Sequence, residues 1–232
     1  MINIWLMGGL GNQLFQINYA SYLANLDFEV RLNYYLTQSN CITKILNWSQ
    51  HEFIVSDYVQ GHNFIYESNV LAIFLAKSNL FNHYSSYDIS NFHSLNSFGY
   101  RQQKKLNERV YFKHNFPQKF SDTEYVMHFR ASDMNDKMSA FKYYNAVLSK
   151  LPSTSIKVIT NAASEFEVLK LKYSNIEFHI QSGNLLEDFS YMLGAGKFIG
   201  APSTLSWWAA KLSKKEQLFL PNELTGNVGE II

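Results

Sequence analysis

Three short segments hold residue types that could bind a phosphorylated ligand. The first is Gly8-Gly9-Leu10-Gly11-Asn12-Gln13, which follows a short apolar stretch at the start of the chain. Glycines after a strand let the backbone approach a ligand closely, and the N–H groups of the next helix point into the same space. The spacing departs from the G-x-G-x-x-G of dinucleotide-binding turns. The segment therefore predicts either a plain strand-to-helix turn or a ligand-binding loop of another kind.

The second segment is His128-Phe129-Arg130-Ala131-Ser132-Asp133, at the end of a predicted strand. Ligands of parallel α/β sheets bind at the carboxyl ends of strands. An arginine there can hold a pyrophosphate through two parallel hydrogen bonds. His128 or Asp133 could orient Arg130 or contact the ligand. The structural alternatives are a hydrogen-bonded histidine at position 128 and a helix N-cap at Asp133.

The third segment is Ala201-Pro202-Ser203-Thr204-Leu205-Ser206, which follows a predicted strand and opens a predicted helix. Hydroxyl groups and uncapped N–H groups at a helix N-terminus form a site that favours an anion. The alternative is that Ser203 or Thr204 only caps the helix. We expect Trp207 and Trp208, which come next, to pack in the core.

The sequence lacks the patterns of several other chemistries. It has no Asp-x-Asp pair and no His/Cys cluster at metal-ligand spacing. It also has no P-loop and no G-x-S-x-G elbow. We therefore expect Arg130 and a helix terminus, without a metal ion, to neutralise any diphosphate leaving group.

The second half of the chain alternates strands with helices, which is typical of an α/β fold with a parallel sheet. These elements would place the second and third segments at strand ends. The predicted strands cover 124–129, 156–160, 176–180, 197–200 and 217–220, and the predicted helices lie near 138–150, 163–172, 184–194 and 204–214.

The first half is less regular. It begins with one predicted βαβ unit, made of a strand over 2–7, a helix over 12–26 and a strand over 28–33. From about 35 to 98 the pattern predicts only one element, a helix near 69–77. A basic run over 100–119 marks the boundary between the halves and is either a solvated helix face or an anion-attracting surface. One apolar stripe of the first helix would hold Leu14, Phe15, Tyr19, Tyr22, Leu23 and Leu26.

Composition excludes several classes of protein. The 232 residues are 17% charged and 16% aromatic, which does not fit a disordered chain. The net charge of +1 provides no global field for nucleic acid, and the single cysteine excludes an intrachain disulfide. The longest apolar run, 70–76, is shorter than the roughly 20 residues that span a bilayer. We expect a cytoplasmic protein.

Together the three segments resemble the α-1,2-fucosyltransferases of glycosyltransferase family 11. Residues 8–16 match the family's Gly-Gly-Leu-Gly-Asn-Gln-(Leu/Met)-Phe-Gln opening. Residues 128–133 align with its His-x-Arg-Arg-x-Asp motif, although Ala131 replaces the second arginine, and 202–208 align with its Asn-Ser-(Ser/Thr)-Phe-Ser-Trp-Trp signature. Shorter similarities lie at Gly99-Tyr100-Arg101-Gln102, Tyr143-Tyr144 and Asp188-Phe189-Ser190-Tyr191-Met192.

The resemblance implies two facing Rossmann-like domains of the GT-B type, with residues 1–115 on the acceptor side and residues 116–232 binding the GDP-sugar donor. Arg130, with His128 and Asp133 beside it, would form the catalytic group, and Asp133 is the one candidate general base. The resemblance also implies the donor contacts: Arg130 would contact the β-phosphate, and Asp188 would contact guanine. The pyrophosphate would be held by Ser203, Thr204 and Ser206. Gly9 would lie near the sugar, with Asn12 and Gln13 on the acceptor side.

The implied reaction is the inverting transfer of L-fucose from GDP-L-fucose to a hydroxyl, O2 of galactose, on an oligosaccharide or lipid-linked acceptor, as in O-antigen synthesis. It needs no cofactor, no metal and no nucleic acid partner. A peripheral contact with the inner membrane would use Lys211, Lys214 and Lys215. Two alternatives stay open: transfer from another GDP-sugar such as GDP-colitose or GDP-mannose, and a non-catalytic glycan-binding protein whose active site was lost at Ala131.

Overall fold

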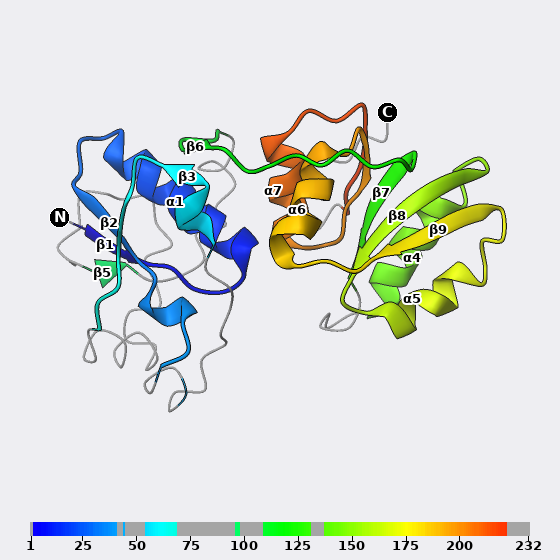
Figure 1. Ribbon diagram of the computed structural model, residues 1–232, viewed down its shortest axis with the longest axis horizontal. Coiled ribbons are helices and arrows are strands. Elements are labelled where there is room, and N and C mark those ends of the chain that lie inside the picture. Colours follow the sequence, from blue (N-terminus) through cyan, green and yellow to red (C-terminus); the bar gives the residue numbers. More distant parts are fainter. Residues whose placement is uncertain are drawn as a thin grey trace. The chain divides into compact units, whose positions relative to one another are not determined.

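The computed structural model describes residues 2–40, 44, 54–68, 96–97, 109–130 and 137–221. The chain divides into two compact units, Met1–Phe116 and Pro117–Ile232. We call them the N-terminal unit and the C-terminal unit and describe each by itself (Figure 1).

The N-terminal unit contains a parallel sheet with the strand order β4-β2-β1-β5. A small antiparallel pair joins β3 to β6. The expected βαβ start is confirmed: β1 leads through the glycine loop into α1, and β2 follows. The elements are β1 (Ile2–Trp5), α1 (Leu10–Ala24), β2 (Val30–Asn33), β3 (Val59–Gln60), β4 (Asn63–Ile65), β5 (Asn96–Ser97), β6 (Lys113–His114) and the short 3-10 helices η1 (Tyr35–Thr37) and η2 (Val55–Asp57).

Helix α1 is buried over most of its circumference, which differs from the single apolar stripe expected from the sequence. Gln13, Gln16 and Asn18 are each fully buried. The Asn18 amide donates to the Arg109 carbonyl (3.0 Å) and its oxygen accepts from the Tyr111 N–H (2.8 Å). The helix is therefore covered by a later part of the chain. Leu26, expected on the stripe, lies beyond the helix end and is 44% exposed.

The C-terminal unit contains a parallel sheet with the order β11-β10-β7-β8-β9. Figure 1 labels β7, β8 and β9 of this sheet. The alternation predicted from the sequence is confirmed, and each predicted strand and helix is present within a few residues of its expected range. The elements are β7 (Tyr125–Phe129), α4 (Lys137–Leu148), β8 (Thr154–Thr160), α5 (Ala163–Lys170), β9 (Ile176–Gln181), α6 (Leu185–Gly194), β10 (Lys197–Ile199), α7 (Thr204–Leu212) and β11 (Gln217–Phe219).

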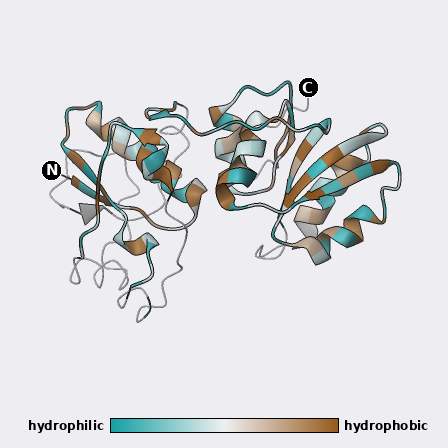
Figure 2. Ribbon diagram, in the orientation of Figure 1, coloured by the Kyte–Doolittle hydropathy of each residue, from teal (hydrophilic) through white to brown (hydrophobic). Residues whose placement is uncertain are grey.

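Strand β7 is the centre of this unit and is buried at every position. In Figure 2 the strands of this sheet carry brown apolar segments interrupted by teal polar ones, and β8 is only partly buried along its length. Phe129 closes β7 and packs against Tyr144 of α4 and Phe166 of α5, with ring centroids 4.9 and 5.3 Å apart. This aromatic contact holds α4 and α5 on the sheet beside the carboxyl end of β7.

The order of the strands defines one switch point in the C-terminal unit. From β7 the chain adds β8 and β9 on one side, and then crosses to add β10 and β11 on the other. In open parallel sheets, ligands bind outside the carboxyl ends of the strands at the position where the order reverses. That position is between β7 and β10, the strands that precede Arg130 and Ser203.

Some predictions fall on residues that the structure does not describe. These are the helix near 69–77, the segment 99–102, and positions 131 and 133, so Asp133 has no structural outcome. Among the described helices, none combines the length and the apolar character needed to cross a membrane.

Candidate functional site at the carboxyl ends of β7 and β10

The structure brings the second and third segments together. Strands β7 and β10 are neighbours in register, with Ile199 beside Met127. One residue further along β7, His128 Nδ1 forms a hydrogen bond of 2.7 Å with Ser206 Oγ in the first turn of α7. His128 is 8% exposed. This is the structural alternative considered for His128, and the bond fixes the start of α7 against the end of β7.

Ser206 takes a different role from the one predicted. Its side chain is fully buried, and its Oγ also accepts the Ala201 N–H at 2.8 Å. We predicted a direct contact with pyrophosphate, but the hydroxyl is enclosed and already bonded. Ser203 caps α7, because its Oγ accepts the Ser206 N–H at 3.2 Å. Thr204 is half-buried, and the cap of this helix is formed by Ser203 rather than by Thr204.

Replacing Ser206 with alanine should destabilise the protein. The change leaves the buried Ala201 N–H without its acceptor and His128 Nδ1 without its partner, and an unsatisfied buried polar group costs roughly 1–3 kcal/mol. Ser213→Ala is the matched control, because the Ser213 hydroxyl donates to the Ala209 carbonyl at the C-terminal end of the same helix. Urea unfolding should show a clear loss for Ser206→Ala and a loss under about 0.5 kcal/mol for the control. Equal losses would contradict the role given to Ser206.

Arg130 is the first residue after β7 and is half-buried. Its N–H donates to the Tyr144 hydroxyl at 3.2 Å, and that hydroxyl donates to the His128 carbonyl at 2.9 Å. Burial raises the pKa of Tyr144, against smaller opposing effects of the hydrogen bond from the Arg130 backbone and of the Arg130 charge, so the hydroxyl stays protonated. The end of β7 is thus held on both sides of Phe129.

Arg130 and the first turn of α7 follow the carboxyl ends of the neighbouring strands β7 and β10, and both carry positive charge. The N–H groups of Thr204 and Leu205 belong to a first turn, where amides have no acceptor within the helix, and the helix dipole adds partial positive charge. Arginine adds a full charge with a planar array of donors. The arrangement can hold a diphosphate and stabilise negative charge that develops on it.

Asp188 lies in the first turn of α6, after Asn184, whose side chain caps the helix by accepting the Glu187 N–H at 2.9 Å. The Asp188 Oδ1 atom is buried and has no hydrogen-bond partner among the described residues. Burial, and then the charge of Glu187, raise the pKa of Asp188 to about 6. Gly183 lies against this carboxylate, because a Cβ there would come within 3.1 Å of Oδ1. A ligand with an N–H or O–H group could donate the hydrogen bond that Asp188 Oδ1 lacks among the described residues.

The glycine loop of the N-terminal unit lies at the carboxyl end of β1. Gly8 has a φ of +75°, a conformation that favours glycine. The Gln13 amide donates to the Gly8 carbonyl at 2.9 Å, and the Met7 N–H donates to Gln16 Oε1 at 2.9 Å. The prediction that Gln13 faces an acceptor is therefore corrected, because this fully buried side chain shapes the loop from inside. Gly9 and Asn12 remain half-buried at the loop.

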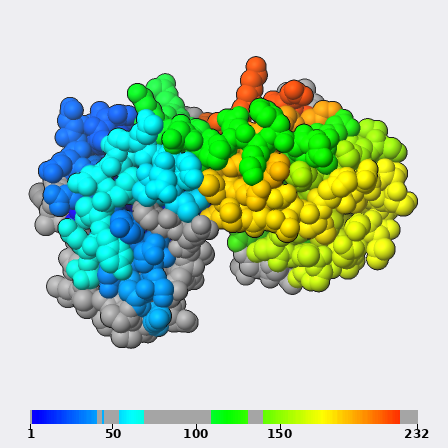
Figure 3. All heavy atoms as spheres, in the orientation of Figure 1, coloured from blue at the N-terminus to red at the C-terminus, as the bar shows by residue number. Residues whose placement is uncertain are grey.

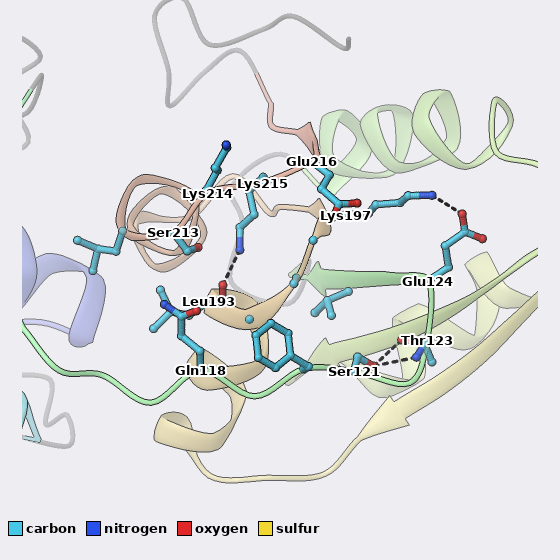
Figure 4. A pocket seen from close by; sticks show the side chains of 16 residues that line it. Gln118, Ser121, Thr123, Glu124, Leu193, Lys197, Ser213, Lys214, Lys215 and Glu216 are labelled. Carbon is cyan, nitrogen blue, oxygen red and sulfur yellow. Dashed lines mark hydrogen bonds and ion pairs between the residues drawn. The ribbon is translucent and has the colours of Figure 1, made fainter.

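A pocket of about 730 Å³ lies at the opposite edge of the C-terminal sheet, among the loops that enter β7, β10 and β11 (Figure 4). Lys215 crosses it to donate to the carbonyls of Met192 and Leu193 at the end of α6. Burial lowers the pKa of Lys215 to about 8. This lysine therefore stabilises a helix terminus and is not placed for the predicted membrane contact. The second and third segments follow the carboxyl ends of β7 and β10, so the pocket lies apart from them.

Among the described residues, no three His, Cys, Asp or Glu side chains are grouped as a metal ion would require. Compared with family models, with curated proteins and with solved structures, the chain has no match.

Proposed function

We propose that this protein is an inverting glycosyltransferase that moves L-fucose from GDP-L-fucose to a galactose hydroxyl of a glycan acceptor. One observation supports this most strongly. Arg130 and the N-terminus of α7 follow the two strands at the switch point of the C-terminal sheet, and the His128–Ser206 hydrogen bond joins the end of β7 to the start of α7. Parallel sheets bind nucleotides at this position. In the full proposal, the two units form a GT-B arrangement in which the acceptor occupies the N-terminal unit.

The proposed chemistry places charge stabilisation at the diphosphate. The acceptor oxygen forms a bond to C1 of fucose from the face opposite the diphosphate. The C1–O bond to the diphosphate breaks, its electron pair goes to GDP, and the hydroxyl proton is taken up by a base. Negative charge grows on GDP in this step, and Arg130 with the α7 amides stabilises it. No metal ion is required in this proposal.

Asp188 supplies the proposed guanine contact. The N1–H and N2–H₂ groups of guanine are donors, and an ionised carboxylate can accept from both. Its buried oxygen has no partner among the described residues, and bound guanine would satisfy the carboxylate. Adenine lacks this pair of donors, so the contact would favour GDP over ADP.

Guanosine affinity should depend on pH through Asp188. The carboxylate must be ionised to accept both donors, and its pKa is raised to about 6, so affinity should fall as the pH is lowered through that value. Guanosine is the right probe because it has no phosphate that titrates in the same range. Asp188→Asn should abolish the pH dependence and reduce the preference for GDP over ADP. A pH dependence that persists in Asp188→Asn would exclude Asp188 as the guanine contact.

The unliganded protein offers a second readout of the same group. The pKa of folded Asp188 lies above the unfolded value of about 3.9, so the ionised form weakens the fold. The contribution is fully favourable below about pH 4 and is lost as the pH rises through 6. The free energy of unfolding should therefore decline less over this range in Asp188→Asn than in the wild type.

The transferase proposal is tested by incubating the protein with GDP-L-fucose and a panel of galactosides in excess EDTA. We expect release of GDP and an α-linked product, with the linkage determined by NMR. GDP-colitose and GDP-mannose tested in parallel identify a different sugar preference. GDP release that depends strictly on Mg²⁺ or Mn²⁺ would contradict the metal-independent mechanism. Glycan binding without any GDP release from any donor would favour the non-catalytic alternative.

A further inference from the structure

The Tyr144 hydroxyl connects helix α4 to the first peptide beyond β7. The strand ladder with β8 ends at the pair Phe129 and Thr160, so the Arg130 N–H lies just outside the regular strand. Tyr144 provides the acceptor for this N–H at 3.2 Å and donates to the His128 carbonyl at 2.9 Å. One side chain therefore holds the backbone on both sides of Phe129.

Packing alone does not require this hydroxyl. Tyr144 is fully buried, and its ring already packs against Phe129 at 4.9 Å, which a phenylalanine could also do. A buried hydroxyl is costly unless it is hydrogen-bonded. Here both its donor and its acceptor capacity are used, and both partners are backbone groups next to the residue proposed to bind phosphate. The bonds fix the direction in which the chain leaves β7.

We infer that Tyr144 is a positioning residue, which sets the placement of Arg130 for the diphosphate without touching the ligand itself. The inference rests on the proposed function, because it assigns a role at the same site. Small displacements of a group that binds the reacting part of a substrate lower the rate strongly, because a displacement of about 1 Å can reduce the rate on the order of 10²-fold. Loss of the Tyr144 hydroxyl would free the Arg130 peptide and should weaken the diphosphate contact while leaving the base contact unchanged.

The neighbouring Tyr143 provides a matched control. Its hydroxyl donates to the Phe219 carbonyl of β11 at 2.9 Å, so Tyr143→Phe likewise removes a bonded tyrosine hydroxyl from α4, here from a half-buried residue. Tyr144→Phe removes two hydrogen bonds and Tyr143→Phe one, so urea unfolding is measured for both variants. They should differ at the ligand, because the Tyr143 bond is made to another strand and involves no residue of the proposed site.

The experiment measures GDP and guanosine affinities by calorimetry for the wild type, Tyr144→Phe and Tyr143→Phe. We expect Tyr144→Phe to weaken GDP binding by up to about tenfold, the equivalent of one hydrogen bond, with guanosine affinity unchanged. Tyr143→Phe should change neither. The ratio of the two affinities separates positioning from a general loss of folding, because partial unfolding would lower both affinities equally.

A double-mutant cycle tests whether Tyr144 acts through Arg130. In an Arg130→Ala background, Tyr144→Phe should cause no further loss of GDP affinity, since coupled residues are not additive. Additive losses would overturn the inference. If Tyr144→Phe does not fold, 3-fluorotyrosine at position 144 keeps the ring and weakens the hydroxyl oxygen as an acceptor. It should move the ratio in the same direction, and an unchanged ratio would again overturn the inference.

Failure of the proposed function would look different. A wild-type protein that does not bind GDP would overturn both the proposed function and the inference that depends on it. A wild-type protein that binds GDP, with Tyr144→Phe behaving like Tyr143→Phe, would overturn the inference alone.

Discussion

Replacing Arg130 with lysine is expected to lower turnover by about 10²–10³-fold. Lysine keeps the positive charge but loses the planar array of donors, so it cannot make two parallel hydrogen bonds to phosphate oxygens. Because the proposed contact strengthens as charge develops on GDP, kcat and kcat/KM should fall together. Initial rates of GDP release over a range of GDP-L-fucose concentrations provide both constants.

Thermal stability of the same variant separates this outcome from a structural role. Arg109→Lys is the control, because Arg109 is exposed and precedes the C-terminal unit. If Arg130 acts on the ligand, Arg130→Lys should melt close to the wild type and still be slow. An enzyme with a lowered melting temperature and turnover reduced only in proportion would instead assign Arg130 to the fold.

Gly194→Ala is expected to have the largest effect on stability. Gly194 is buried at the end of α6, and a Cβ there would lie 2.2 Å from the Lys119 carbonyl oxygen and 2.6 Å from its carbon. Residues 117–121 run along α6 at this surface (Figure 3), tied by the hydrogen bond from the Lys119 N–H to the Ser190 carbonyl. Both clashing atoms are backbone, so the segment must move. Overpacking of this kind costs roughly 1–3 kcal/mol and sometimes more.

Gly196→Ala is the control for that change. Two residues further on, a Cβ would be 3.4 Å from the Glu216 carboxyl carbon, an ordinary contact with a flexible side chain. Urea unfolding should show a loss of at least about 1 kcal/mol for Gly194→Ala and little change for Gly196→Ala. Similar curves for the two variants would show that residues 117–121 do not pack on α6 as described.

The fold of the C-terminal unit could be predicted from the sequence because its signals are local. Strands β7, β8, β9 and β10 are each followed by a helix, and β7 (Tyr125–Phe129) is buried at every position. Much of the N-terminal unit could not be predicted, because its strands and buried side chains contact residues that are far away in the sequence. Strand β5 is only Asn96–Ser97, and it pairs with β1 over more than ninety residues of chain. The burial of Asn18 depends on a segment about as far away.

The site was predictable in position but not in detail. The segments after β7 and β10 indicated strand ends, but their adjacency depends on the strand order, which periodicity does not encode. The buried bonds of Ser206 and Gln13 could not be distinguished from ligand contacts by residue type, because the same polar groups serve both purposes. The position of Tyr144 one turn from the end of α4 gave no signal that its hydroxyl reaches the Arg130 N–H.

The most direct test of the central claim is amide hydrogen exchange of the wild-type protein with GDP-L-fucose, with GDP, and with a UDP-sugar as the negative control. The proposal predicts slower exchange at Arg130, over 201–206 and at the start of α6 around Asp188, with GDP-L-fucose and GDP but not with the UDP-sugar. Protection should persist in excess EDTA. GDP-L-fucose that leaves exchange at all three places unchanged at a saturating concentration would contradict the assignment of the donor site to the carboxyl ends of β7 and β10.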